Sequence, residues 1–76
     1  MSVLEELKWN YNYNLGRYYN GISYLEKHPK QFEKWITEIL DIRKNIDELL
    51  AEIMKQQEVS REEILIGFKE VIRCQK

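Results

Sequence analysis

The chain has 76 residues, with 12 Lys and Arg against 13 Asp and Glu, one His and one Cys. This near-neutral balance argues against a protein that grips nucleic acid by its phosphates, because such proteins carry a basic excess. A single cysteine excludes a disulfide within the chain, and no apolar stretch approaches the roughly 20 residues of a membrane span. We therefore expect one soluble domain, at a size where a hydrophobic core is only just sufficient.

The segment from 3 to 27 has the pattern of an amphipathic helix. Ser2 and Glu5 have the spacing of a capping box. Downstream, apolar residues recur at steps of three and four, namely Leu4, Leu7, Tyr11, Leu15, Tyr18, Ile22 and Leu25. Between Trp9 and Asn14 aromatic residues alternate with Asn, a period typical of a strand. We expect a helix there, because the helical stripe continues on both sides; a strand is the alternative.

His28 and Pro29 separate this helix from a second one, predicted over 30–57. The residue before a proline is pushed out of the helical region, and proline suits the first position of a helix. The apolar residues of the second helix again follow steps of three and four, at Phe32, Trp35, Ile39, Ile42, Ile46, Leu49 and Ile53. Because the connection is short, the two helices must be antiparallel neighbours. We expect a structural role for His28.

Arg43 falls, by its helical angle, inside the apolar half of the second helix, with Asp47 one turn away. We expect its stem to lie on the apolar surface while its guanidinium reaches water or Asp47. The alternative is a buried polar contact that fixes the register of helix pairing.

A third helix is predicted over 61–74. Ser60 and Glu63 form a second capping box, and Val59 and Ile64 have the spacing of a hydrophobic staple. The expected fold is all-α. It is an antiparallel two-helix hairpin with a shorter third helix, a three-helix bundle that dimerisation completes.

The sequence lacks the residue combinations that catalysis and metal binding require. One His and one Cys, far apart in the chain, provide neither a nucleophilic triad nor the ligands of a zinc site. The carboxylates of the second helix mostly have Lys or Arg companions four residues away, as on an ordinary solvated face. We therefore expect no enzyme, no cofactor, no metal and no small-molecule substrate.

The unequal lengths of the helices leave surface for a partner. The third helix, about 20 Å long against about 40 Å for the others, should cover only one end of the hairpin. Aromatic residues and an Arg also gather on the outer side of the first helix, and such residues anchor protein interfaces. The predicted partner-binding residues are Trp9, Tyr13, Arg17, Tyr18, Tyr19, Ile22, Tyr24, Trp35 and Ile36. The alternative is that these residues are core.

These observations favour a non-catalytic protein-binding module that forms a dimer or binds another protein. The first ten residues lack the apolar run of a signal peptide, so we expect a cytoplasmic location. Nine Ile, eight Lys and five Asn against a single Ala suit an AT-rich genome, which points to an accessory or inhibitor protein of a phage or mobile element. The alternative function is a small dimeric DNA-associated transcriptional regulator, although the spacing around Val59 is too long for a helix-turn-helix motif.

Overall fold

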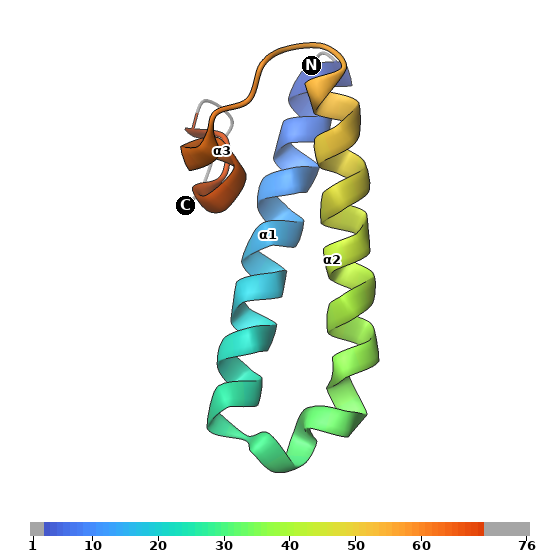
Figure 1. Ribbon diagram of the computed structural model, residues 1–76, viewed down its shortest axis with the longest axis vertical. Coiled ribbons are helices and arrows are strands. Elements are labelled where there is room, and N and C mark those ends of the chain that lie inside the picture. The colour runs from blue at the N-terminus through green and yellow to red at the C-terminus, as the bar shows by residue number, and fades with distance from the viewer. Residues whose placement is uncertain (1–2, 70–76) are drawn as a thin grey trace.

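The computed structural model describes residues 3–69, which form helices joined by short connections (Figure 1). Two helices are long, α1 over Val3–Lys27 and α2 over Phe32–Met54, whereas α3 covers only Arg61–Ile66. A 3₁₀ turn over Pro29–Gln31 joins the long pair. Within the described residues there is no strand. The prediction of an all-helical chain with two long helices and a short third is therefore confirmed.

α1 is helical throughout, including the segment in which aromatic residues alternate with Asn. The alternative of a strand there is wrong, because burial follows the helical period. Lys8, Tyr11 and Leu15 are all buried, at steps of three and four residues. A strand would place Lys8 and Tyr11 on opposite faces, since its side chains alternate. The predicted cap residue Ser2 lies outside the described residues.

The connection between α1 and α2 follows from Pro29. His28, the residue before it, has φ −132° and ψ 66°, outside the helical region, as expected before a proline. Because Pro29 opens a 3₁₀ turn, the α-helix begins at Phe32 rather than at residue 30. α2 also ends earlier than predicted, at Met54, since residues 55–57 form a turn and a bend.

α3 begins as the sequence predicts but ends much earlier. Ser60 Oγ accepts a hydrogen bond from the Glu63 N–H at 3.1 Å, and the Glu63 carboxylate accepts one from the Ser60 N–H at 3.0 Å. The predicted helix over 61–74 stops at Ile66, because Gly67 takes a φ of 111°, which only glycine adopts readily. Of the predicted helical residues, 70–74 lie outside the described part of the chain.

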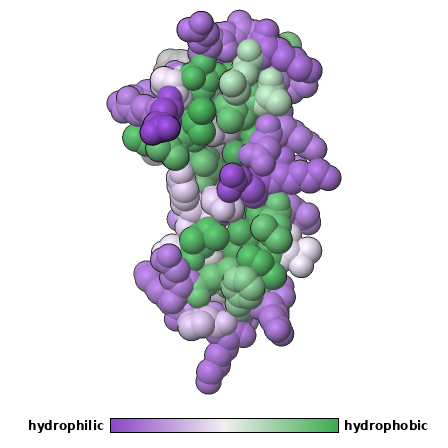
Figure 2. All heavy atoms as spheres, viewed as in Figure 1, coloured by the Kyte–Doolittle hydropathy of each residue, from purple (hydrophilic) through white to green (hydrophobic). Residues whose placement is uncertain are grey.

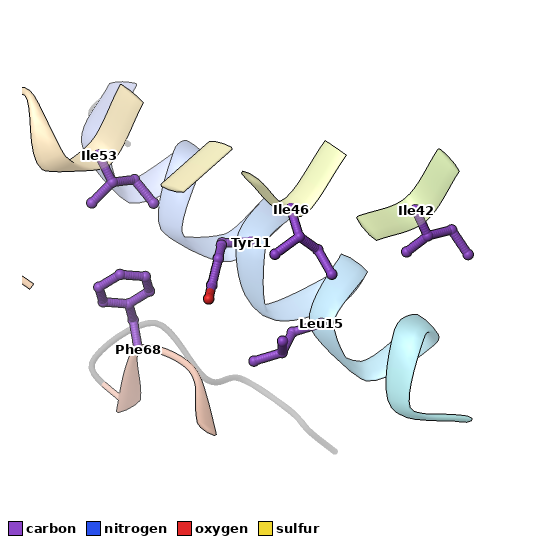
Figure 3. Close-up of a cluster of buried hydrophobic side chains, with 6 residues drawn as sticks. All are labelled: Tyr11, Leu15, Ile42, Ile46, Ile53 and Phe68. Carbon is purple, nitrogen blue, oxygen red and sulfur yellow. The ribbon is translucent and has the colours of Figure 1, made fainter. Parts of the chain in front are cut away.

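The core is a cluster of side chains from α1, from α2 and from Phe68, which follows α3; α3 itself contributes none. Its buried members are Tyr11, Leu15, Ile42, Ile46, Ile53 and Phe68 (Figure 3). α3 contributes no buried residue, whereas Phe68, just beyond it, is completely buried. The Phe68 ring meets that of Tyr11 edge-on, with 5.4 Å between centroids. The third layer of the predicted bundle is therefore supplied mainly by one aromatic side chain.

α3 covers only the open half of the hairpin, where α1 begins and α2 ends (Figure 1). The Tyr11 hydroxyl donates to the Ile64 carbonyl oxygen at 2.6 Å, which attaches α3 to α1. In the other half, here called the turn half (residues 20–42), the described chain provides no third layer. We call the side of the hairpin on which α3 lies the front face and the opposite side the rear face.

Candidate functional site

The nine predicted partner-binding residues lie on two different faces of the hairpin. Consecutive residues of a helix point about 100° apart, and this separates Trp35, which lines a hollow on the rear face, from Ile36. Trp35 therefore belongs with the residues on the outer side of α1 and not with its neighbour in sequence. Tyr18 and Tyr19 line a hollow with Ile64 and Leu65 and so lie on the front face, where the helical spacing also places Ile22 and Ile36. The rear face holds Trp9, Tyr13, Arg17, Tyr24 and Trp35.

An apolar ridge crosses the turn half of the front face. Phe32, Ile36 and Leu40 follow one another at steps of four on α2, which places them in one row, and Ile22 lies one turn beyond Tyr18 on α1. Phe32 is 50% exposed and Leu40 is 58% exposed. Figure 2 shows hydrophobic surface in this half, separated by a hydrophilic band from that of the open half. We call Ile22, Phe32, Ile36 and Leu40 the front strip.

Tyr18 and Tyr19 stand at the boundary between the covered and uncovered halves. The Tyr19 hydroxyl donates to the Leu65 carbonyl oxygen at 2.7 Å, so α3 reaches further along α1 than the sequence analysis placed it. The Tyr18 hydroxyl accepts a hydrogen bond from Arg43 at 3.4 Å. Both tyrosines thus have partners within the chain, which leaves the front strip as the uncovered part of this face.

Arg43 lies with its guanidinium in solvent. Its Nε is 3.4 Å from Asp47 Oδ1, and 54% of its side chain is exposed. The hydrogen bond to Tyr18, followed by that to Asp47, raises the pKa of Arg43. The expected contact with Asp47 is therefore present, and the alternative of a buried polar contact that fixes register is wrong. Arg43 instead joins α2 to α1 from outside the core.

The rear face has a hollow between α1 and α2 in the turn half. Its volume is about 470 Å³. The lining residues are Arg17, Asn20, Gly21, Tyr24, Trp35, Glu38, Ile39 and Ile42. A Cβ at Gly21 would lie 3.0 Å from Ile39 side-chain atoms, so glycine allows the helices to approach closely there. Arg17 and Glu38 face each other across the hollow, 4.0 Å apart, and each is about half exposed.

Stacked rings continue from this hollow along the outer side of α1. The rings of Trp9 and Tyr13 are parallel, with 5.6 Å between centroids, and the Arg17 guanidinium lies 5.8 Å from the Tyr13 ring centroid. Further along, Tyr24 stacks on the His28 ring at 4.3 Å. This last contact fits the structural role expected for His28. The stacks hold exposed rings in fixed positions, which lowers the entropy that a partner must remove on binding.

A second hollow follows the first along the same furrow, in the open half of the rear face. It has a volume of about 550 Å³. Its lining is polar and consists of Asn10, Asn14, Asn45, Glu48, Leu49 and Glu52. The two hollows lie about one turn apart, since Asn14 precedes Arg17 by three residues and Ile42 precedes Asn45 by three. We call the two hollows together the rear furrow.

Sequence reasoning missed the residue that holds the segment after α3 in place. Asn12 accepts a hydrogen bond from the Phe68 N–H at 2.7 Å and donates one to the Phe68 carbonyl oxygen at 2.9 Å. Lys8, also unremarked, lies with its Nζ 5.5 Å from the Phe68 ring centroid. The sequence offers one indication of this role: Asn12 directly follows Tyr11 at the edge of the apolar stripe, where an amide can reach a neighbouring backbone.

Among residues 3–69, no group of three or more His, Cys, Asp or Glu side chains could hold a metal ion. The helices in this part of the chain are too short or too polar to cross a bilayer. The geometry instead offers two surfaces, the front strip and the rear furrow. Comparisons of the chain with protein families, curated proteins and solved structures gave no match.

Proposed function

We propose that the chain is a non-catalytic protein-binding module that forms a symmetric dimer through the front strip. The observation that carries this proposal is the ridge of half-exposed apolar residues, Phe32 and Leu40 above all, that no other described segment covers. Contiguous exposed apolar surface on a small soluble protein usually marks an interaction site.

The shape of the front face favours a second copy. Each hairpin carries α3 in its open half and an uncovered ridge in its turn half. A two-fold axis across the middle of the front face would set the open half of each copy against the turn half of the other, which makes the interface isologous. α3 offers suitable residues for this contact, because Leu65 is 54% exposed and Ile66 is 60% exposed.

The substitution Leu40→Glu tests this interface. It places a carboxylate in the centre of the proposed contact, where burial of an unpaired charge is strongly unfavourable. We expect the wild-type protein to sediment at twice 9.3 kDa and the variant at the monomer mass, with unchanged helix content by circular dichroism. The matched control is Tyr13→Glu, at a site of similar exposure on the rear face, which should remain dimeric.

Two results would contradict the proposal. A monomeric wild-type protein at high concentration would remove the front strip as a self-association surface. A dimer that resists Leu40→Glu but is broken by Tyr13→Glu would assign self-association to the rear face. The alternative of a DNA-associated regulator gains nothing from α3, because its first turn carries Glu62 and Glu63, which would repel phosphates.

A further inference from the structure

The rear furrow has the length of a groove for a short helix. Its lining runs on α1 from Asn10 to Tyr24, which is about 21 Å at 1.5 Å per residue. A partner helix of about 14 residues would span it, and amphipathic helices in hydrophobic grooves are a recurring mode of recognition. The furrow lies on the face opposite to the front strip, so a dimer formed there would leave it open.

The two ends of the furrow differ in chemistry. In the turn half, the rings of Tyr24 and Trp35 line the hollow together with Gly21, which packs closely against the Ile39 side chain. Aromatic walls around such a hollow suit a large apolar side chain, which would act as the anchor of the interface. In the open half, the hollow is polar, and Glu48 and Glu52 lie along its α2 side.

The charges along the furrow are unevenly distributed. Three carboxylates line its hollows, those of Glu38, Glu48 and Glu52, against the single guanidinium of Arg17. All three acids belong to α2. Glu38 lies 4.0 Å from Arg17 and Glu52 lies 3.2 Å from Lys55, so with these two cations counted the edge keeps one net negative charge, at Glu48. Complementary charge steers association and suppresses wrong partners. The acidic edge also disfavours single-stranded nucleic acid, whose phosphates would meet carboxylates beside the stacked rings.

We propose that the rear furrow binds a basic amphipathic helix of another protein. A large apolar residue of that helix fills the hollow between Tyr24 and Trp35. On α2 the lining of this hollow runs from Trp35 to Ile42, with Glu38 near its middle, and from Glu38 to Glu48 is ten residues, about 15 Å. The Lys or Arg residues that meet the acidic end therefore lie about ten residues from the apolar anchor. This proposal stands apart from the dimer, since it uses other residues on the other face.

A displayed library of random helical peptides of about 14 residues tests this inference, with Leu40→Glu protein as the bait so that the front strip is disabled. We expect the enriched peptides to combine a Leu, Ile, Phe or Trp with Lys or Arg about ten residues away. Binding of a selected peptide should change the emission of Trp35, measured in a Trp9→Phe background. It should weaken as salt is raised, because exposed charges are screened.

Charge reversal provides the matched comparison. Glu48→Lys with Glu52→Lys should weaken the selected peptides about tenfold or more, since each exposed pair accounts for up to about a factor of five. The control pair Glu26→Lys with Glu33→Lys changes the same charge at exposed sites outside the furrow and should have little effect. The proposal is overturned if no peptide is enriched, if enriched peptides lack basic residues, or if the two pairs behave alike. Preferential binding of a single-stranded oligonucleotide would overturn it as well.

Discussion

The side-chain amide of Asn12 attaches the segment after α3 to α1, because it forms hydrogen bonds with both backbone polar groups of Phe68. Its amide pairs with the N–H and the carbonyl of Phe68, whose side chain is completely buried. Asn12→Ala would leave both groups without these bonds, and each unsatisfied buried polar group costs about 1–3 kcal/mol. After the gain in helix propensity on changing Asn to Ala, we expect a net loss of about 2 kcal/mol in the free energy of unfolding, measured by urea denaturation.

The control for Asn12 lies two residues away. Asn14 donates only to the carbonyl oxygen of Asn10 in its own helix, at an exposed position. Asn14→Ala should therefore change the free energy of unfolding by less than about 0.5 kcal/mol. Equal effects of the two substitutions would show that the bonds to Phe68 do not hold the segment.

Tyr11 gives the stability of the protein a pH dependence above neutrality. Burial, followed by the negative charges that Tyr19 and Asp47 can carry, raises the pKa of Tyr11, while Arg43 lowers it. The folded state holds the phenolic proton more tightly than the unfolded state. The resulting contribution of Tyr11 to the free energy of unfolding is complete below the unfolded pKa of about 10. It is lost as the pH rises through that value toward the folded pKa.

Tyr11→Phe isolates this effect. The variant loses the hydrogen bond to the Ile64 carbonyl, so at pH 8 it should be less stable than the wild type by about 1 kcal/mol. Between about pH 10 and pH 11, the difference should shrink, because deprotonation of Tyr11 destabilises only the wild-type protein. Urea titrations at several pH values measure it, and a constant difference across this range would contradict the assignment.

At the scale of elements, the sequence predicts where helices begin better than where they end. The capping box of Ser60 and Glu63 marks the start of α3, and Pro29 leaves few choices for the turn between α1 and α2. The end of α3 could not be predicted, because Ile64, Leu65 and Phe68 continue the helical spacing through Gly67. A single glycine costs only about 1 kcal/mol within a helix, so local propensity alone does not determine where α3 ends. The burial of the Phe68 ring against Tyr11 requires the chain to leave the helix at Gly67.

The candidate surfaces were predictable in composition but not in arrangement. The uncovered turn half followed from helix lengths, and Phe32 and Leu40 are exposed there. The separation of Trp35 from Ile36 follows from the helical angle, yet proximity in sequence suggested one surface. The path of the chain beyond Ile66 depends on contacts between residues more than 50 positions apart, such as Asn12 and Phe68. A periodic pattern holds no information about such pairs.

A substitution at Gly67 tests why α3 ends, and one at Gly16 in α1 serves as its control; the two should change the free energy of unfolding in opposite directions. At Gly67, φ is 111° and an added Cβ would lie 2.6 Å from Asn12 Oδ1. Gly67→Ala should therefore destabilise the protein by more than about 1 kcal/mol. Gly16, in the interior of α1, has open space around it, so Gly16→Ala should stabilise by about 0.5–1 kcal/mol. Denaturant midpoints that shift in the same direction would contradict this account of why α3 ends.

At the scale of the whole molecule, the two proposed surfaces lie on opposite faces of one hairpin, the front strip for self-association and the rear furrow for a partner helix. The stability of α1 and α2 comes from the seam between them, which both surfaces leave intact. α3 and Phe68 close only the open half, so a second copy would complete the front face while the rear furrow stays available. Self-association and partner binding can then occur together, because their residues do not overlap.

Dimerisation through the front strip would make thermal stability depend on protein concentration. If folding is coupled to dimerisation through the front strip, mass action favours the folded dimer as concentration rises. The wild-type Tm, followed by circular dichroism over about a hundredfold range of concentration, should increase by a few degrees for each tenfold step. Leu40→Glu should lower the Tm and remove its dependence on concentration, whereas Tyr13→Glu should retain it. A wild-type Tm that stays constant over the whole range would mean that the hairpin reaches its full stability alone, with the front strip exposed to water.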